Sequence, residues 1–228
     1  MYSRFIFIVS LILVCASASA QELSSRSLLF RGRVASSYPY IKYTGIYYAY
    51  SPEYKEGIVK YNHKLYKGVY LNYNAHKDEM CVDNGQGMQK IALNKKFFEY
   101  CVFDNMKFVY LSGIEKMDDR YYQVLFECED AVLYKKIYKH YEARDVNKEF
   151  LERVSYYLYK DGEYTQIRNA HHLLKIYPEH KKMRYKEQGS VDGDLVVILD
   201  KIYNVEGGRW DDWLSYPFFC CCAHLFGG

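Results

Sequence analysis

The 228-residue sequence lacks a strong net charge, since 31 Lys and Arg stand against 28 Asp and Glu. The formal charge of +3 gives no support to nucleic acid or an anionic membrane surface as a partner, because both attract concentrated positive charge. The basic pairs Lys135-Lys136 and Lys181-Lys182 are short and typical of a solvated face. No internal repeat is visible.

The sequence also lacks an apolar run that could span a bilayer, which needs about 20 residues. The run Phe5–Val14 is shorter, follows Arg4 and leads into the small residues Ala18-Ser19-Ala20. This pattern predicts a secretory signal peptide over residues 1–20, cleaved before Gln21. The alternatives to cleavage are an uncleaved anchor and a lipid-modified Cys15, and the lipid anchor is disfavoured because Val14 before Cys15 is not small. We therefore expect export to the periplasm, the cell surface or the exterior, with no transmembrane segment after cleavage.

Tryptophan is scarce, and both Trp residues lie near the C-terminus, whereas the chain has 27 Tyr. Tyrosine favours half-buried sheet surfaces, where the ring faces inward and the hydroxyl reaches water. The excess therefore predicts a sheet with amphipathic faces. A recognition face for a glycan or a peptide is the alternative, because tyrosine is also enriched at binding surfaces.

From Glu56 onward the hydrophobic period is two, which predicts strands. In Leu65–Tyr73 one face collects Leu65, Val69, Leu71 and Tyr73. The other face carries Tyr66, Gly68, Tyr70 and Asn72. Tyr66 and Tyr70 are thus the candidate residues for binding a glycan or peptidoglycan.

Short turn sequences separate the expected strands. Asp161-Gly162 is the clearest type I′ signal, and Asp104-Asn105 has the same hairpin pattern. Asn62-His63, Asn84-Gly85 and Glu129-Asp130 separate further pairs of strands. Val132–Tyr141 fits either a strand or an amphipathic helix, and its Tyr, Ile and Val content favours a strand.

After Ile167 the period becomes helical. Asn169 is expected to cap a helix through about Ile176, and Pro178 to begin a second helix that ends at Gly189. Ser190 or Asp192 is expected to cap a third helix. The fold class is therefore α+β, with an antiparallel, hairpin-rich β-meander followed by a short C-terminal helical segment.

The organisation follows from these patterns. After the signal peptide, residues 21–50 are expected to be irregular, 51–167 to form the antiparallel β region and 168–206 the helical segment. Residues 207–228 form an apolar tail that contains both Trp, three consecutive Cys and no Lys. Either an error in the reading frame or gene model, or a partner-binding or membrane-touching segment, accounts for this change of composition.

Two segments carry a resemblance to a family. They are SPEYKEGIVKYNHKLYKGVYLNYNAHKDEMCV (Ser51–Val82) and YYLYKDGEYTQIRNAHHLLKIYPEHKK (Tyr156–Lys182). Their cadence resembles a family of small exported bacterial proteins with a β-rich front and a Lys-rich helical end. The resemblance implies export and the β-then-α order, and it brings no activity or catalytic residue. Members of that family tend to end soon after the third helix, so residues 207–228 depart from the pattern.

Six cysteines follow the signal peptide, but their spacing does not indicate a disulfide framework. Cys81, Cys101 and Cys128 are scattered through strands, whereas Cys220, Cys221 and Cys222 are adjacent. We interpret the first three as small buried hydrophobic residues. One disulfide among them is the alternative.

No catalytic set, metal site or cofactor motif emerges from the other residues. The pair His171-His172 lacks the spacing of a metal site, and capping explains Asp192. The leading hypothesis is an exported, non-enzymatic binding or structural module of the cell envelope or exterior. The alternatives are a glycan or peptidoglycan binder and a small hydrolase that pairs Cys81, Cys101 or Cys128 with a histidine.

Overall fold

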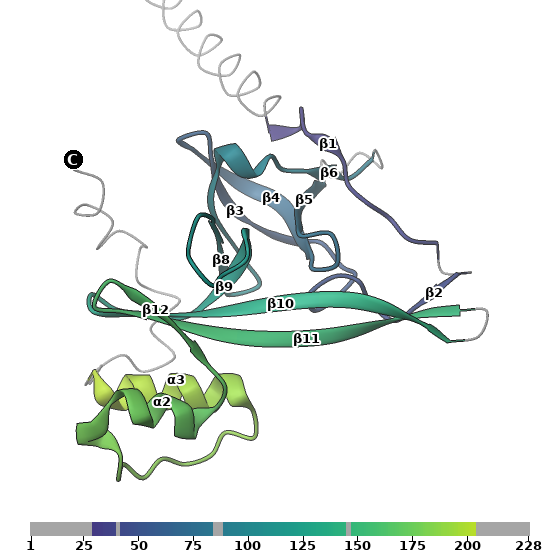
Figure 1. The fold of residues 1–228 in the computed structure, drawn as a ribbon. Helices are drawn as coiled ribbons and strands as arrows, with labels where there is room; N and C mark the ends of the chain where they lie inside the picture. The colour runs from purple at the N-terminus through teal and green to yellow at the C-terminus, as the bar shows by residue number, and fades with distance from the viewer. Residues whose placement is uncertain (1–28, 40–41, 84–88, 145–146, 204–228) are drawn as a thin grey trace, which may run out of the picture. The chain divides into compact units, whose positions relative to one another are not determined.

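Strands dominate the structure, a computed structural model that describes residues 29–39, 42–83, 89–144 and 147–203 (Figure 1). The predicted signal peptide, the Asn84-Gly85 turn and the apolar tail lie outside the described residues. The large mixed sheet and the two short α-helices near its C-terminal end confirm the α+β fold class.

The chain forms two compact units, and it passes between them more than once. The first unit comprises the described parts of Met1–Gln123 together with Ile137–Arg153. The second unit comprises Val124–Lys136 and the described part of Val154–Gly228. Each unit has its own hydrophobic core.

The first unit is built from antiparallel hairpins. The strand order is β1-β6-β5-β4-β3-β7-β8-β9, and β2 pairs in parallel with β11 (Asn147–Lys160), which makes the sheet mixed. The strands of this part of the sheet are β1 (Arg33–Val34), β2 (Tyr43–Thr44), β3 (Lys55–Tyr61), β4 (Lys64–Asn74), β5 (Glu79–Asp83), β6 (Ile91–Ala92), β7 (Phe98–Phe103), β8 (Met106–Leu111) and β9 (Arg120–Glu127). The short 3-10 helix η1 (Lys95–Phe97) joins β6 to β7.

The tight turns adopt the left-handed backbone that their sequences predict. Asn62 and His63 connect β3 to β4 with φ of 50° and 62°, and Asp104 and Asn105 connect β7 to β8 with φ of 51° and 58°. Type I′ hairpins require positive φ at both central residues, which Asn, Asp and Gly tolerate best. These hairpin predictions are confirmed.

Large aromatic side chains fill the core of the first unit. Tyr73, Tyr121 and Phe108 are fully buried. The ring of Tyr73 packs against the other two, with centroid distances of 5.5 Å to Phe108 and 5.7 Å to Tyr121. Part of the tyrosine excess therefore provides core volume.

The second unit combines the ends of long strands with two helices. Its strand order is β9-β10-β11-β12, with β10 (Ala131–Arg144), β11 (Asn147–Lys160) and β12 (Glu163–Ile167). The extended β10 confirms the strand interpretation of Val132–Tyr141. Asp161 and Gly162, with φ of 52° and 82°, form the predicted turn between β11 and β12.

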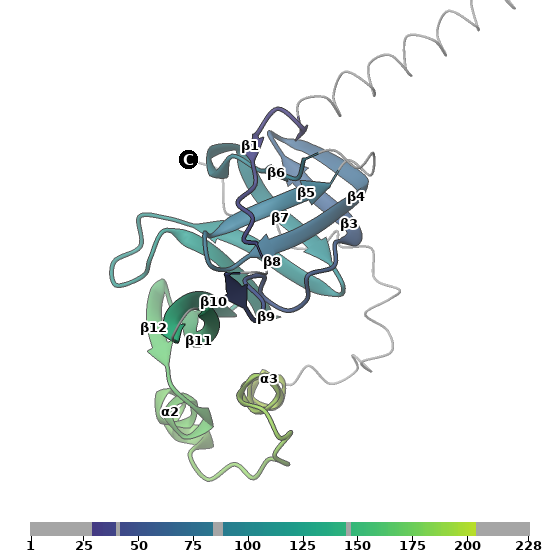
Figure 2. The same cartoon turned by 90° about the vertical axis from the view of Figure 1, so that its right-hand side faces the viewer.

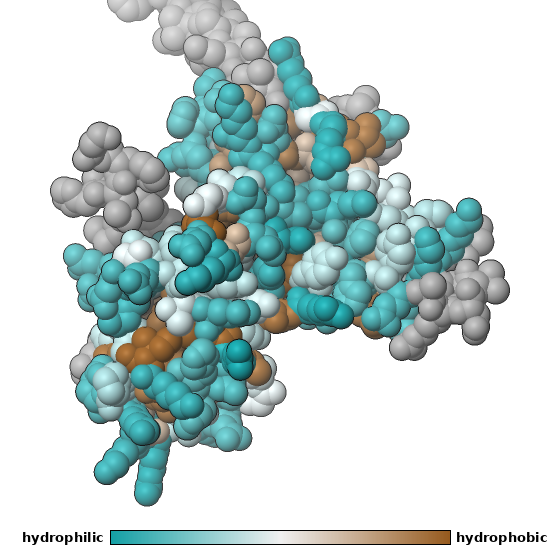
Figure 3. Space-filling model, in the orientation of Figure 1, coloured by the Kyte–Doolittle hydropathy of each residue, from teal (hydrophilic) through white to brown (hydrophobic). Residues whose placement is uncertain are grey.

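Two α-helices follow β12 and lie beside each other (Figure 2). In α2 (Ala170–Ile176) the side chain of Asn169 accepts a hydrogen bond from the backbone N–H of His172, which confirms that cap. In α3 (Val191–Ile202) Ser190 caps through the N–H of Gly193. Apolar side chains of α3 face the core of this unit, and apolar surface gathers around the helices in Figure 3.

The predicted second helix over Pro178–Gly189 is wrong beyond its first turn. Only the 3-10 helix η2 (Pro178–His180) forms, and the chain then continues without regular structure to Gly189. Met183 and Tyr185 are the hydrophobic residues of this stretch that pack on the core. Their spacing of two suits an extended chain and not a helix.

Asp192 has a different role from the predicted cap. Its carboxylate lies 2.5 Å from Nζ of Lys135 on β10 and accepts a hydrogen bond of 2.6 Å from the hydroxyl of Tyr156 on β11. Lys135 is buried, whereas 33% of the Asp192 side chain is exposed, and their contact joins the first turn of α3 to the sheet. Ser190 provides the cap instead.

Candidate functional site

Tyr66 and Tyr70, the two tyrosines proposed for binding, lie on opposite faces of β4. The register against β3 shifts at an extra residue, Gly68, whose φ is +64°. Such a β-bulge inverts the alternation of side chains. Tyr66 is therefore only 6% exposed, Tyr70 is 45% exposed, and Leu65 points to solvent and not to the core. The expected uninterrupted alternation is wrong here, so the two tyrosines do not share one face, while the binding role of Tyr66 and Tyr70 stays a prediction.

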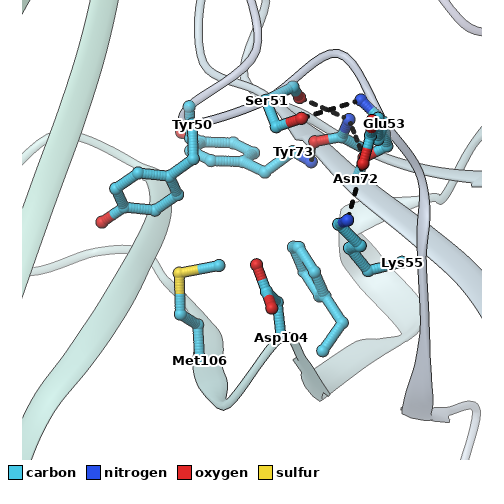
Figure 4. Close-up of a pocket in the computed structure, with 10 residues that line it drawn as sticks. Tyr50, Ser51, Glu53, Lys55, Asn72, Tyr73, Asp104 and Met106 are labelled. Atoms are coloured by element: carbon cyan, nitrogen blue, oxygen red, sulfur yellow. Dashed lines mark hydrogen bonds and ion pairs between the residues drawn. The ribbon is translucent and has the colours of Figure 1, made fainter.

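A narrow hollow lies between the loop Tyr50–Lys55 and the β7–β8 hairpin (Figure 4). The amide of Asn72 donates to the carbonyl oxygens of Ser51 and Glu53, both at 2.9 Å. These bonds hold the loop against β4. The volume of about 10 Å³ has room for little more than one water, so this hollow is not a ligand site.

A much larger pocket of about 610 Å³ lies elsewhere in the first unit. Its size falls within the range of about 300–1,000 Å³ that is typical of small-molecule sites. Four short segments form its wall: the chain at the start of β1, the β3–β4 turn, the beginning of β5, and β6 with η1. The lining residues are Arg31, Gly32, Arg33, Tyr61, Asn62, Asp78, Glu79, Ala92, Leu93, Asn94, Lys95 and Phe97.

Asp78 is the buried centre of one wall. Its Oδ1 accepts hydrogen bonds from the hydroxyl of Tyr73 at 2.8 Å and from the backbone N–H of Tyr121 at 3.0 Å. Its Oδ2 forms an ion pair with Nζ of Lys95, and Nε of Arg120 lies 3.7 Å from Oδ1. Burial raises the pKa of the Tyr73 hydroxyl far above its usual range, and the Asp78 carboxylate raises it further, so this hydroxyl remains a donor.

The backbone of Asp78 adopts a conformation that most side chains avoid. Its φ is +56°, in the left-handed region where Asp, Asn and Gly are favoured. Asp78 lies in the turn between β4 and β5, and its carboxylate accepts the hydrogen bond from the Tyr73 hydroxyl. In the sequence, Asp78 stands in the short polar stretch that follows the expected strand Leu65–Tyr73. Asp78 is an acidic residue between β4 and the buried strand β5. That position is the sequence feature that could have indicated a buried role.

Glu79 is also buried, with only 1% of its side chain exposed. Its Oε1 accepts from the hydroxyl of Ser36 at 2.9 Å and lies 2.7 Å from Nη2 of Arg33. Its Oε2 accepts from the backbone N–H of Ser36 at 2.9 Å. These bonds tie the chain after β1 to the beginning of β5. Glu79 therefore restrains one end of Arg33 through this ion pair, while 69% of the Arg33 side chain is exposed.

The rim of the pocket combines an aromatic side with a cationic side. The rings of Tyr61 and Phe97 meet edge to face at 6.0 Å, and Phe97 is 41% exposed. Nζ of Lys95 lies 5.1 Å from the ring centroid of Tyr110 and 5.6 Å from that of Tyr121. The ion pair with Asp78 and these ring contacts restrain the Lys95 side chain, so its ammonium group is held in a defined place.

No family model, curated protein or solved structure matches this chain. Among the residues that the structure describes, no helix has the length and apolar character to cross a membrane. The same residues contain no group of three or more His, Cys, Asp or Glu side chains arranged to hold a metal ion.

The three described cysteines carry no disulfide and are poorly suited to nucleophilic attack. Burial, together with the Glu79 carboxylate, raises the pKa of Cys81 to about 12, and burial raises that of Cys101 well above its usual range. Burial also raises the pKa of the half-buried Cys128. Thiol nucleophiles need a depressed pKa, so these environments work against the hydrolase hypothesis.

A cluster of aromatic rings surrounds Phe150 on β11 in the first unit. Five rings have their centroids between 5.2 and 6.0 Å from that of Phe150, and they belong to Tyr38, Tyr43, Tyr47, His76 and Tyr141. Tyr141 is 40% exposed, and Nζ of Lys148 lies 4.7 Å from its ring centroid. The sequence indicated tyrosine-rich faces without locating this one, because its members come from distant segments.

Proposed function

We propose that this chain is an exported, non-enzymatic binding module of the cell envelope or exterior. Its binding site is the pocket bounded by the start of β1, the β3–β4 turn, the beginning of β5, and β6 with η1. The volume of about 610 Å³ carries this proposal, since it accommodates a small molecule. The signal-peptide pattern in residues 1–20 supports the exported location.

The internal bonding of the walls supports a preformed site. Asp78 and Glu79 each hold side chains or backbone groups from distant segments, so Lys95 and Arg33 are positioned before a ligand arrives. Preorganised groups lose less conformational entropy on binding. The thiols of Cys81 and Cys101 are buried outside the lining of this pocket, which favours binding over covalent chemistry.

The binding proposal is tested by NMR titration of the protein lacking residues 1–20. The probes are glucose, glucuronate, glucose 6-phosphate and inorganic phosphate, and the readout is the backbone amide spectrum. We expect at least one probe to shift the amides of Ala92–Phe97 and Asn62 in a saturable manner. Absence of such shifts for all four probes in a folded sample would overturn the proposed site.

The exported location has a separate test. Expression of the full chain in a bacterial host should give a mature protein that begins at Gln21, as read by N-terminal sequencing of the secreted or periplasmic fraction. A matched variant, Leu11→Arg, places a charge in the apolar run and should keep the protein in the cytoplasm unprocessed. An intact N-terminus on the wild-type protein in that fraction would contradict the cleavage site.

The aromatic cluster around Phe150 is the second candidate surface, for a glycan. Its exposed Tyr141 ring beside Lys148 is the observation that favours it. In the same titrations this candidate predicts shifts at residues 148–150 that disappear in Tyr141→Ala. Shifts confined to Ala92–Phe97 would exclude it for these probes.

A further inference from the structure

We infer that the ligand of this pocket is a small organic anion, with a carboxylate or phosphate group attached to a compact ring or apolar body. The inference rests on the proposed binding function and names the chemical class of the ligand. The anion would lie against Arg33 and Lys95, and the body against Phe97 and Tyr61.

The two carboxylates that line the pocket, Asp78 and Glu79, are already bonded to groups of the protein. Both oxygens of Asp78 are engaged, by Tyr73, Tyr121 and Lys95, and both oxygens of Glu79 are engaged, by Ser36 and Arg33. The two side chains are also buried, so their charges stabilise the protein's own donors. They are therefore poorly placed to accept hydrogen bonds from a ligand.

The charged side chains of the pocket include more cations than carboxylates. Arg31, Arg33 and Lys95 line the pocket, and Arg120 pairs with Asp78 from behind. The three lining cations oppose the two lining carboxylates, which leaves a net charge of +1 in the lining, and Arg120 adds a further cation next to Asp78. Arg31 and Arg33 are exposed, and 35% of the Lys95 side chain is exposed. Positive charge gathered around a concave site attracts anions.

The rim of the pocket offers several N–H hydrogen-bond donors. Arg33 contributes a guanidinium of which one nitrogen contacts Glu79, and Lys95 contributes an ammonium with three N–H donors. Asn62 and Asn94 add side-chain amides. Carboxylate and phosphate oxygens match such donors, because charge-assisted hydrogen bonds are the strongest of their kind.

The aromatic side of the rim favours a ligand with a ring or apolar body. Phe97 and Tyr61 offer apolar surface that a bare inorganic ion does not use. The volume of about 610 Å³ is also far larger than one phosphate ion requires. An anion that carries a ring or other compact body fits both halves of the site.

The four probes separate these requirements. Glucuronate and glucose 6-phosphate should bind at least roughly tenfold more tightly than glucose, since one charge-assisted hydrogen bond corresponds to about that factor. Inorganic phosphate should bind more weakly than glucose 6-phosphate, because it lacks the body. Preference for glucuronate over glucose 6-phosphate, or the reverse, decides between a carboxylate and a phosphate ligand.

Two variants test the assigned cations. Arg33→Gln removes an exposed cation, and Lys95→Gln removes the restrained one. Each should weaken the acidic probes by roughly tenfold and leave glucose unchanged. The matched control is Lys67→Gln, an exposed lysine on β4 outside the pocket, which should change neither.

The possible failures are distinguishable. If glucose binds at Ala92–Phe97 as tightly as glucuronate, or if Arg33→Gln weakens both equally, the anion inference is overturned and the binding site stands. If no probe shifts these amides, the proposed function itself fails. Lys95→Gln could disturb Asp78, so its circular dichroism is compared with wild type, and Arg33→Gln alone decides the outcome if that variant is unfolded.

Discussion

Replacing Asp78 by Asn removes the negative charge from the buried centre of the first unit while keeping the shape of the side chain. Asn tolerates the left-handed backbone almost as well as Asp, so the φ of +56° adds little strain. The change therefore isolates the electrostatic contribution. It leaves Lys95 and Arg120 facing a neutral amide.

The magnitude follows from the exposure of the two cations. Removing one partner of a buried ion pair typically costs about 3–5 kcal/mol. Side chains of Arg120 and Lys95 are 15% and 35% exposed, so water compensates part of the loss at Lys95. We expect the free energy of unfolding to fall by about 3 kcal/mol, at the lower end of that range.

Urea unfolding followed by far-ultraviolet circular dichroism measures this change. Tyr73→Phe is the comparison variant, because it removes the hydroxyl that donates to Asp78 at 2.8 Å and leaves every charge in place. That loss should cost about 1.5–2 kcal/mol, as expected for a hydrogen bond to a charged group. The reasoning is refuted if Asp78→Asn costs no more than Tyr73→Phe.

Four further predictions concern separate parts of the chain. Gly57→Ala should lower the free energy of unfolding by about 1–3 kcal/mol, since its Cβ would lie 2.2 Å from the carbonyl oxygen of Val102; an unchanged urea midpoint would contradict this packing. Gly162→Val should cost about 1–3 kcal/mol because φ is +82°, and an unaltered midpoint would argue against the type I′ turn. Burial lowers the pKa of His76 below 6.5, so the unfolded chain takes up its proton first and stability should fall as pH drops below about 6.5; a His76→Gln variant with the same pH profile would refute this. Truncation after Glu206 should leave secretion and melting temperature unchanged, and a clear loss of stability would show that the tail packs on the fold.

Local chemistry made the hairpins and helix caps predictable. The turns Asn62-His63, Asp104-Asn105 and Asp161-Gly162 consist of residues that tolerate positive φ, and the structure shows that conformation at all of them. Asn169 and Ser190 cap through their own side chains. Each of these features depends on two to four neighbouring residues, which a single sequence displays directly.

The features that escaped prediction depend on distant residues or on one glycine. Gly68 reads as an ordinary member of an alternating strand, yet it inserts the bulge that separates Tyr66 from Tyr70. Asp192 looks like a helix cap because its partner Lys135 lies 57 residues away.

The pocket also escaped prediction because it depends on distant residues. The partners of Asp78 and Glu79 come from segments on both sides of them in the chain. A carboxylate in a turn is usually solvated. Only the folded sheet reveals which ones are buried and satisfied by the protein.

The path of β10 and β11 limits how this protein can be divided. Residues 137–153 belong to the first unit, yet they are inserted in the sequence between the two segments of the second. A fragment that ends at Gln123 lacks part of the first unit, and one that begins at Val154 lacks part of the second. Neither unit is a contiguous piece of chain, so deletion variants are poor tools for assigning the binding site. Point substitutions within the intact protein are the appropriate means.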